Sequence, residues 1–444
     1  MRAIEVVPRG VASSAGYGAC EIGTHIKLDP EQLVSYRLAK WEPVIEDALV
    51  VCAAIEYCDR RQSRPQKAWG REFPLRVHVH EPARWSAPQV QSALAAALRC
   101  LTGDVWRLEF VQRQKDPEDI IQTNFEIPEP NSLMIPFSNG MDSWALWQLV
   151  KEQNPVLVRL GGGSNKSRRR RGKREAFERI PFRVPDQDFK ERSGRSRGFK
   201  FAMVSGLAAY LSGSTKVIVP ESGQGALGPV LVTHRYGDYR SHPVFLNKME
   251  KLFRALLNYE LRYEFPRLWS TKGQTLAAAV AKTKDEGWRK TRSCWQKPRQ
   301  IRVGKNQPLR QCGFCAACIL RRMSVHAAGL EEPANTYAFE NVSAATLSAG
   351  MAEGFPVDSL HGNQHAYAVA GAMHFDHLAA LRRSEDSAVL SLQARELARA
   401  LGEDEVSVKQ KLDGLLAQHE AEWDAFLKSL APGSFIRQRS AGVS

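Results

Sequence analysis

The chain has 444 residues, which is the length of two or three ordinary domains. Lys and Arg number 62 against 48 Asp and Glu, so the formal net charge is +14. The hydrophobic share of 43% excludes a wholly disordered or fibrous protein, and no apolar run approaches the roughly 20 residues that cross a bilayer. No secretory signal is visible at the N-terminus, so we expect a soluble, cytoplasmic protein.

The excess of positive charge points to an anionic partner such as a nucleic acid or a nucleotide. It is concentrated in two places: residues 168–174 contain six cations in seven positions, and residues 289–310 form a second basic stretch. Such runs are typical both of solvated loops and of nucleic-acid contacts, and composition does not separate the two. Nucleic acid therefore stays an open partner.

Residues 1–130 are expected to form an N-terminal α/β extension. Their patterns predict helices at 43–60 and 88–101 and strands at 75–80 and 104–112. His78 and His80 share one face of the first of these strands. Because no cysteine lies near them in the sequence, we interpret this face as solvent-facing rather than as a metal site. The Pro-rich segment 127–130 marks the boundary.

From residue 131 to residue 334, strands alternate with helices. The predicted strands are 133–137, 156–160, 180–184, 216–219 and 259–265, and the predicted helices are 141–152, 197–211, 242–257 and 271–282. Alternation of this kind indicates βαβ units and therefore an α/β fold with a doubly wound parallel sheet. Ligands of such sheets bind beyond the carboxyl ends of the strands.

Residues 335–444 are predicted to be a helical C-terminal region, with helices at 363–382, 387–401 and 405–430. We expect the last helix to be broken and the chain to be loose from Ala431. Four histidines occur here at helical spacings: His361, His365, His374 and His377. Without the Glu of an HExxH motif, they are interpreted as part of a helix surface.

A short loop between a predicted strand and a predicted helix carries small and polar residues. Its members are Ser138, Asn139, Gly140, Met141, Asp142 and Ser143. Small residues let successive backbone N–H groups point into one concavity, and the start of the helix adds partial positive charge. The serine hydroxyls can donate hydrogen bonds, and Asp142 can hold Mg²⁺ or brace the loop. The pattern predicts an anion site, although an ordinary N-capped helix would show the same residues.

The eight cysteines fall into two groups. Cys20, Cys52, Cys58 and Cys100 are scattered in apolar or helical contexts. The other four, Cys294, Cys312, Cys315 and Cys318, fall within 25 residues and include two interlocked CxxC spacings. Because a long chain of this kind favours reduced thiols, we expect the second group to hold Zn²⁺ in a closed structural site. A redox pair or an iron–sulfur cluster is the alternative.

These motifs carry a resemblance to a known family. SNGMDS resembles the SGGxDS pyrophosphate loop of the ATP pyrophosphatase (PP-loop) superfamily, with Asn139 in place of the second Gly. TRSCW followed by CGFCAACILRR resembles the end of 7-cyano-7-deazaguanine synthase (QueC). Residues 195–210, 216–225 and 266–280 resemble its intervening segments, so the likeness spans about residues 131–330.

The resemblance implies an enzyme that binds ATP, Mg²⁺ and Zn²⁺, adenylates the carboxylate of a 7-deazaguanine, and joins the activated acid to a nitrogen nucleophile. The implied catalytic residues are Ser138, Asp142 and Ser143. The implied ATP-binding residues are Ser138, Asn139, Gly140, Met141, Asp142, Ser143, Arg195, Arg197 and Gly223. The implied zinc ligands are the four clustered cysteines.

Several departures set this chain apart from the housekeeping synthase. The spacer between Cys294 and Cys312 is longer, the substrate segment has no clean counterpart, and the basic loop at 166–174 is an insertion. Extra regions also flank residues 131–334. The pattern is most similar to the QueC-like (QatC-type) components of bacterial antiphage defence operons. That similarity implies that the deazaguanine is attached to a partner protein, with no role at a membrane.

Two other functions stay open. A PP-loop enzyme acting on tRNA would suit the positive charge, although no second CxxC pair is available to carry sulfur. A catalytically degenerate subunit that only senses ATP or a deazapurine would suit Asn139 and the altered substrate segment.

Overall fold

The computed structural model describes residues 3–29, 42–65, 70–114, 132–160, 177–185, 189–191, 193–232, 236–296, 300–304, 309–383 and 387–440. They form two compact units. The first unit comprises Met1–Ser138, Lys151–Val219 and Asp238–Phe265, and the second comprises Asn139–Val150, Pro220–Gly237 and Pro266–Ser444. The predicted boundary at 127–130 and the basic run at 168–174 lie outside the described residues. Within the described ranges, no helix is both long and apolar enough to span a membrane.

The first unit contains two four-stranded parallel sheets, with strand orders β2-β1-β4-β5 and β10-β9-β6-β7. The strands of one sheet are β1 (Ala3–Val7), β2 (Tyr17–Glu21), β4 (Glu72–Val79) and β5 (Val105–Gln112). Those of the other are β6 (Met134–Phe137), β7 (Val156–Arg159), β9 (Lys216–Ile218) and β10 (Arg262–Glu264). The α/β class with parallel strands, predicted from the alternating pattern, is confirmed.

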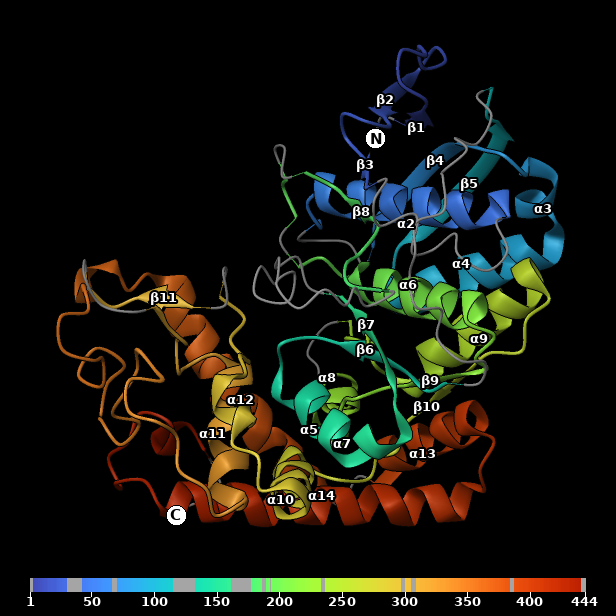
Figure 1. The fold of residues 1–444 in the computed structure, drawn as a ribbon. Helices are drawn as coiled ribbons and strands as arrows, with labels where there is room; N and C mark the ends of the chain where they lie inside the picture. The colour runs from blue at the N-terminus through green and yellow to red at the C-terminus, as the bar shows by residue number, and fades with distance from the viewer. Residues whose placement is uncertain are drawn as a thin grey trace. The chain divides into compact units, whose positions relative to one another are not determined.

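Helices fill the space between these two sheets (Figure 1). They are α2 (Pro43–Arg61), α4 (Pro88–Thr102), α6 (Arg197–Leu211) and α9 (Pro243–Leu257), with the short α3 (Pro82–Ser86) and η1 (Lys151–Gln153) beside the sheets. Helix α2 packs on β4 and α6, and α4 packs on β5 and α9. Because α2 lies between two layers, its residues are buried almost all round, as its run of apolar residues without a polar face requires. One hydrophobic core joins Val77, Leu98 and Met134.

The prediction of a strand at 180–184 is wrong in length and in pairing. Only β8 (Phe182–Arg183) forms, and it pairs antiparallel with β3 (Lys27–Leu28) instead of joining a parallel sheet. Strands β1, β2 and β3 had no prediction, because the runs are short and Glu5 and Gly18 interrupt their apolar character. Their partners lie far away in the chain, so local pattern does not reveal them.

The second unit is mainly helical. Its elements are α5 (Met141–Val150), α7 (Gly223–Ala226), α8 (Gly228–Leu231), α10 (Lys272–Thr283), η3 (Gly287–Lys290), β11 (Ile301–Arg302), β12 (Leu309–Arg310), α11 (Ala316–Ala327), η4 (Val357–Ser359), α12 (Gly362–Arg383), α13 (Ser387–Leu401), α14 (Glu405–Lys428) and η5 (Arg437–Arg439). Helix α10 packs against α5 and α11, and α14 packs against α11, α12 and α13 (Figure 1).

Two expectations for the C-terminal region are wrong. Helix α14 is continuous through Gly414. No atom lies within 4 Å of a Cβ added at this glycine, so its only cost to the stability of the helix is its low helix propensity. The chain beyond Ala431 is packed as far as Ser440. Phe435 and Ile436 are buried, and the Phe435 N–H donates to the Ala344 carbonyl at 2.8 Å.

The interpretation of the histidines also needs correction. His78 Nε2 lies 3.0 Å from Glu5 Oε1, and His80 Nε2 lies 3.9 Å from Glu46 Oε1. Carboxylates that are remote in the sequence therefore face this strand, which is not simply solvent-facing. On α12, burial lowers the pKa of His374 to about 4, so this side chain is not part of an open helix surface.

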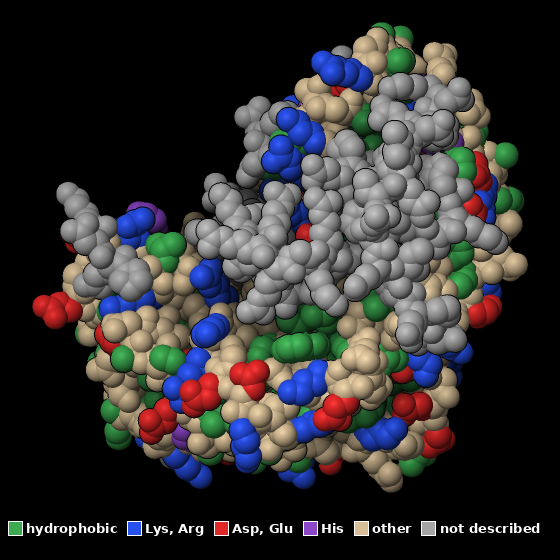
Figure 2. All heavy atoms as spheres, in the orientation of Figure 1, with side chains coloured by type: hydrophobic (Ala, Val, Ile, Leu, Met, Phe, Trp, Pro, Cys, Tyr) green, Lys and Arg blue, Asp and Glu red, His purple; other side chains and the backbone are tan. Residues whose placement is uncertain are grey.

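Lys and Arg side chains are intermixed with Asp and Glu side chains over α14 in Figure 2. Arg383 Nε lies 2.6 Å from Glu420 Oε1, and Lys411 Nζ lies 2.5 Å from Glu403 Oε2. The net positive charge of the chain is thus not gathered on the part of α14 that this face shows.

Candidate functional site

Helix α5 begins directly after the polar loop singled out in the sequence. The Gly140 carbonyl accepts a hydrogen bond from the Ser143 hydroxyl at 3.1 Å and another from the Trp144 N–H at 3.2 Å, which closes the first turn. The Arg292 N–H donates to the Asn139 carbonyl at 2.8 Å. The loop is therefore fastened to the segment that leads into the cysteine cluster.

The Asp142 carboxylate joins three segments of the second unit. Its Oδ2 pairs with Lys272 Nζ, and its Oδ1 accepts a hydrogen bond from the Ser222 hydroxyl at 3.4 Å. The side chains of Asp142 and Lys272 are 14% and 8% exposed, so the pair is nearly enclosed. We call these three residues the Asp142 cluster.

Lys272 is placed by the start of α10. The Thr271 hydroxyl accepts from the Gln274 N–H at 3.0 Å, and the Gln274 side chain accepts from the Thr271 N–H at 3.0 Å, which forms a capping box. The Lys272 N–H donates to Gln224 Oε1 at 2.9 Å. The position of the ammonium group thus depends on a well-defined helix start, whose partial positive charge adds to that of the side chain.

The charge state of Lys272 follows from its surroundings. Burial disfavours the ammonium, but the carboxylates of Asp142 and Glu221 outweigh burial, so the pKa of Lys272 is raised. The side chain is therefore cationic at neutral pH and cannot act as a general base. An ammonium held in this way can bind phosphate oxygens, and the carboxylate beside it can hold a divalent cation. The Asp142 cluster has the chemistry of a nucleotide or other anion site.

The four clustered cysteines come together as predicted. Cys294, Cys312, Cys315 and Cys318 are all buried, and their Sγ atoms lie within 4.8 Å of one another. Each offers one sulfur ligand, so the group is positioned to hold a metal ion. This arrangement is the second feature of the chain with an evident chemical use.

The backbone around the cysteines explains how the group is held. Gly313 has φ +85°, and a Cβ there would lie 2.8 Å from the Phe339 carbonyl oxygen, so the turn requires glycine. The Cys312 N–H donates to Cys294 Sγ at 3.3 Å, which favours the thiolate form. Outside the group, burial raises the pKa of Cys58 to about 12, as expected of an inert thiol.

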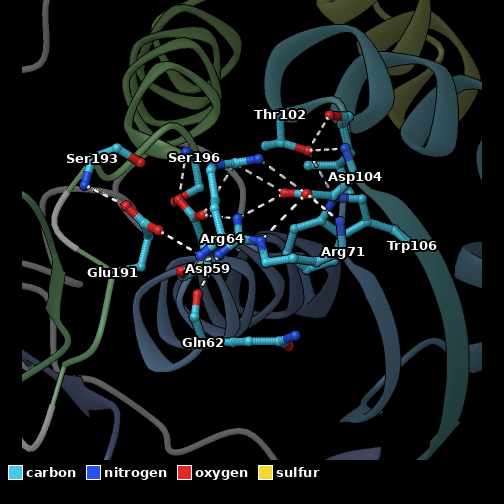
Figure 3. A network of polar contacts seen from close by, with 11 residues as sticks. Asp59, Gln62, Arg64, Arg71, Thr102, Asp104, Trp106, Glu191, Ser193 and Ser196 are labelled. Atoms are coloured by element: carbon cyan, nitrogen blue, oxygen red, sulfur yellow. Dashed lines mark hydrogen bonds and ion pairs between the residues drawn. The ribbon is translucent and has the colours of Figure 1, made fainter. Parts of the chain in front are cut away.

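Arg195 and Arg197 lie in the first unit, on either side in the sequence of Ser196, which belongs to the buried polar network in Figure 3. At its centre, Arg71 NH2 lies 2.5 Å from Asp59 Oδ1 and 2.7 Å from Asp104 Oδ2. Asp59 Oδ2 accepts from the Ser196 N–H at 2.8 Å, which fixes the chain just before α6. The N-terminal region thus holds the backbone that carries both arginines.

Both arginines are engaged within the first unit. Burial and the neighbouring Arg64 guanidinium lower the pKa of Arg195, and the Arg197 guanidinium lies 4.8 Å from the centroid of the Phe201 ring. Ser138 also belongs to the first unit. Of the three implied catalytic residues, only Asp142 is a member of the Asp142 cluster.

Gly223 has a packing role. Its N–H donates to the Ser270 carbonyl at 3.0 Å, and an added Cβ would lie 2.2 Å from the Leu268 oxygen. The glycine therefore allows two backbone segments of the second unit to approach closely.

Sequence reasoning did not select Lys272, Ser222 or Gln224 as individual site residues. Lys272 is the lysine of the 266–280 segment, and the other two lie in the 216–225 segment, so the resemblance contained the signal. The convergence of Lys272 and Ser222 on Asp142 could not be predicted, because Asp142 and Lys272 are 130 residues apart.

Comparisons of the chain with known proteins found no similar protein. No family model matches the chain, and searches of the curated proteins and of the solved structures found no match. A function for this chain has to be argued from its motifs and its geometry.

Proposed function

We propose that the chain is an ATP-dependent enzyme of the 7-cyano-7-deazaguanine synthase (QueC) type, with a doubly wound PP-loop fold. In this proposal it adenylates the carboxylate of a 7-deazaguanine and passes the activated acid to a nitrogen nucleophile. In an antiphage defence setting that nucleophile belongs to a partner protein. The products of the activation step are the acyl adenylate and pyrophosphate, and AMP leaves in the transfer step.

The observation that carries the proposal is the meeting of Asp142, Ser222 and Lys272. Each residue comes from a different stretch that resembles the family: the SNGMDS loop, residues 216–225 and residues 266–280. These stretches follow β6, β9 and β10 along the chain, and parallel sheets of this kind bind ligands beyond the carboxyl ends of their strands. An accidental resemblance gives no reason for three such stretches to converge on one carboxylate.

The chemistry needs charge stabilisation more than a nucleophilic side chain. A substrate carboxylate oxygen attacks the α-phosphorus of ATP, and the bond to the pyrophosphate oxygen breaks. Lys272 would stabilise the charge that develops on the pyrophosphate, and Ser222 would donate to a phosphate oxygen. Asp142 would hold Mg²⁺, which neutralises phosphate charge when bound. Ser138, Arg195, Arg197 and the loop amides stay predicted phosphate contacts.

The metal of the cysteine group is proposed to be Zn²⁺. Four thiolates in a compact group suit its tetrahedral geometry, and a site with four protein ligands leaves no open position for catalysis. Its role in this proposal is therefore structural.

The two alternative functions predict different requirements for ATP cleavage and different products. A tRNA-modifying enzyme would need tRNA before ATP is cleaved. A degenerate sensor would bind ATP or a deazapurine and release no pyrophosphate. Product analysis with deazaguanine substrates and with tRNA alone therefore separates the three functions.

The proposal is tested by measuring AMP and pyrophosphate with ATP, Mg²⁺ and 7-carboxy-7-deazaguanine, with and without the neighbouring operon proteins. Asp142→Asn and Lys272→Met should each lower the rate about a hundredfold or more, because each removes a group that stabilises the transition state. Lys282→Met is the matched control, since Lys282 lies on the exposed far turn of the same helix. If no combination of substrates and neighbours yields either product, the enzyme proposal fails and the sensor takes its place.

A further inference from the structure

A continuous hydrogen-bonded chain runs from the C-terminal helices to Lys272. His419 Nε2 lies 2.9 Å from the Phe375 carbonyl oxygen, and His419 Nδ1 lies 2.8 Å from Gln224 Nε2. Gln224 Oε1 then accepts from the Lys272 N–H at 2.9 Å. His419 and Gln224 are 0% and 2% exposed, so no link of this chain competes with bulk water.

The direction of each hydrogen bond is determined by its neighbours. A carbonyl can only accept, so Nε2 of His419 carries the proton and Nδ1 is the acceptor. Gln224 must therefore donate through its amide nitrogen to His419, which leaves its oxygen for the Lys272 N–H. One neutral tautomer of His419 thus fixes one orientation of Gln224.

A second contact from α14 holds the same helix start. The Thr271 hydroxyl donates to Glu422 Oε1 at 2.5 Å, and Glu422 lies one turn beyond His419 on α14. Glu422 is 5% exposed, and a Cβ at Gly273 would lie 3.2 Å from its carboxylate oxygens. Two residues one turn apart on α14 therefore hold the start of α10, Glu422 by direct contact and His419 through Gln224.

Packing alone does not require this arrangement. Apolar side chains would join α14 to α10 without the cost of burying an imidazole, an amide and a carboxyl group. A directional chain instead fixes the backbone of Lys272 within a fraction of an ångström, and with it the ammonium that pairs with Asp142.

We propose that His419 is a positioning residue for Lys272, acting through Gln224, so that the C-terminal helices α12 and α14 are a working part of the Asp142 cluster. The functional meaning of this inference rests on the proposed function. The geometric part of the inference, that His419 controls the position of the Lys272 ammonium, does not depend on the proposed function.

The test compares two substitutions of His419 in the full-length protein. His419→Leu fills the space but offers no acceptor to Gln224. His419→Asn places an oxygen near the position of Nδ1 and restores the acceptor, while losing the bond to Phe375. His374→Leu is the control, because it removes another largely buried imidazole of the same unit that takes no part in the hydrogen bonds from Phe375 to Lys272.

The first readout is the rate at which acetic anhydride acylates Lys272, relative to the exposed Lys284, followed by peptide mass spectrometry without nucleotide. His419→Leu should raise the relative rate about fivefold or more, because an ammonium released from its position opens to solvent more often. His419→Asn should stay within about twofold of the wild type, and so should His374→Leu. A folded His419→Leu protein with wild-type labelling would overturn the inference.

The second readout is AMP release at saturating ATP. His419→Leu should lower kcat about tenfold with partial rescue in His419→Asn, since misplacement of a charge-stabilising group slows the chemical step. A wild type that releases no AMP counts against the proposed function, and the labelling result then decides the inference by itself. If His419→Leu does not fold, Gln224→Leu breaks the same chain from its other end and is judged by the same labelling criterion.

Discussion

Each unit of this protein buries a network of charged side chains, and the two networks differ in how closed they are. In the first unit, Asp59 and Asp104 have 0% exposed side chains and share the guanidinium groups of Arg71 and Arg64. At the candidate site of the second unit, the Asp142 carboxylate pairs with the Lys272 ammonium, to whose charge Glu221 also contributes, and Asp142 keeps 14% of its side chain exposed.

The comparison separates a scaffold from a candidate site. A buried acid surrounded by two guanidinium groups has its hydrogen-bonding capacity taken up and gains nothing from a ligand. A single pair with one partly exposed member can exchange its partner when a phosphate or a cation arrives. Burial of charge is thus a weak sign of function by itself, and the difference lies in what the charge can still bind.

The largest expected effect on stability comes from removing a cysteine of the metal-binding group in the second unit. Cys315→Ser removes one of four ligands, and the binding energy of a structural zinc ion, about 10 kcal/mol or more, is largely folding energy. The variant should be insoluble or metal-free, whereas Cys100→Ser, outside the group, should keep its metal. Elemental analysis and thermal unfolding provide the measurement. Wild-type protein without zinc, or a metal-free variant of unchanged stability, would contradict the assignment.

The next largest effect on stability is expected from breaking the buried ion-pair network of the first unit. Arg71→Met leaves two buried carboxylates with Arg64 as their remaining cation among the contacts described, so the free energy of unfolding should fall by about 3–5 kcal/mol. Arg107→Met is the control, because Arg107 pairs with Glu72 while 71% of its side chain is exposed. Exposed pairs contribute about 1 kcal/mol at most. Equal losses in the two variants, measured by urea unfolding, would remove the distinction between a closed network and a surface pair.

Acid should weaken the second unit through its buried imidazoles. Burial lowers the pKa of His419 to about 4, so the unfolded chain binds a proton at pH 5 that the folded protein does not. Stability therefore decreases as the pH falls from about 6.5 towards 4, by about 2 kcal/mol at pH 5 for His419 alone. Urea midpoints measured between pH 7.5 and pH 5 should show this slope, and His419→Asn should reduce it. An unchanged slope in the variant would assign the acid sensitivity to other groups.

The smallest expected effect on stability comes from neutralising the candidate site as a whole. The double variant Asp142→Asn/Lys272→Met removes both members of the ion pair together, so neither is left buried without the other. Its free energy of unfolding should lie within about 1 kcal/mol of the wild type, while each single variant loses more. Pyrophosphate release should nevertheless be about a hundredfold slower or more in all three. A double variant that is as unstable as Arg71→Met would make the Asp142 pair a scaffold like the first network.

Features that depend on neighbouring residues were predicted closely. Helix α6 has the predicted bounds of 197 and 211, and α13 those of 387 and 401. The metal-binding group was found because its four cysteines repeat at short spacings that few other structures require. Local periodicity and ligand spacing are properties of the sequence itself.

Features that depend on distant contacts were not predicted. Strand β8 pairs with β3, although its sequence fits a parallel strand equally well. Gln224 and His419 are 195 residues apart, and neither has an unusual local context. Because pairing partners and buried polar contacts are selected by the packed structure, one sequence alone contains no local sign of them.

The interleaving of the two units has a consequence during synthesis. The growing chain passes from one unit to the other five times, the last time after Phe265. Helix α5 leaves the ribosome long before its packing partners α10 and α11, and at ordinary translation rates its buried face waits on the order of ten seconds or more for them. Strand β6 similarly precedes its partner β9 by about 80 residues. Newly made chains should therefore depend on chaperones, and a gene cut anywhere between residues 139 and 265 should yield fragments that aggregate unless both halves are made together.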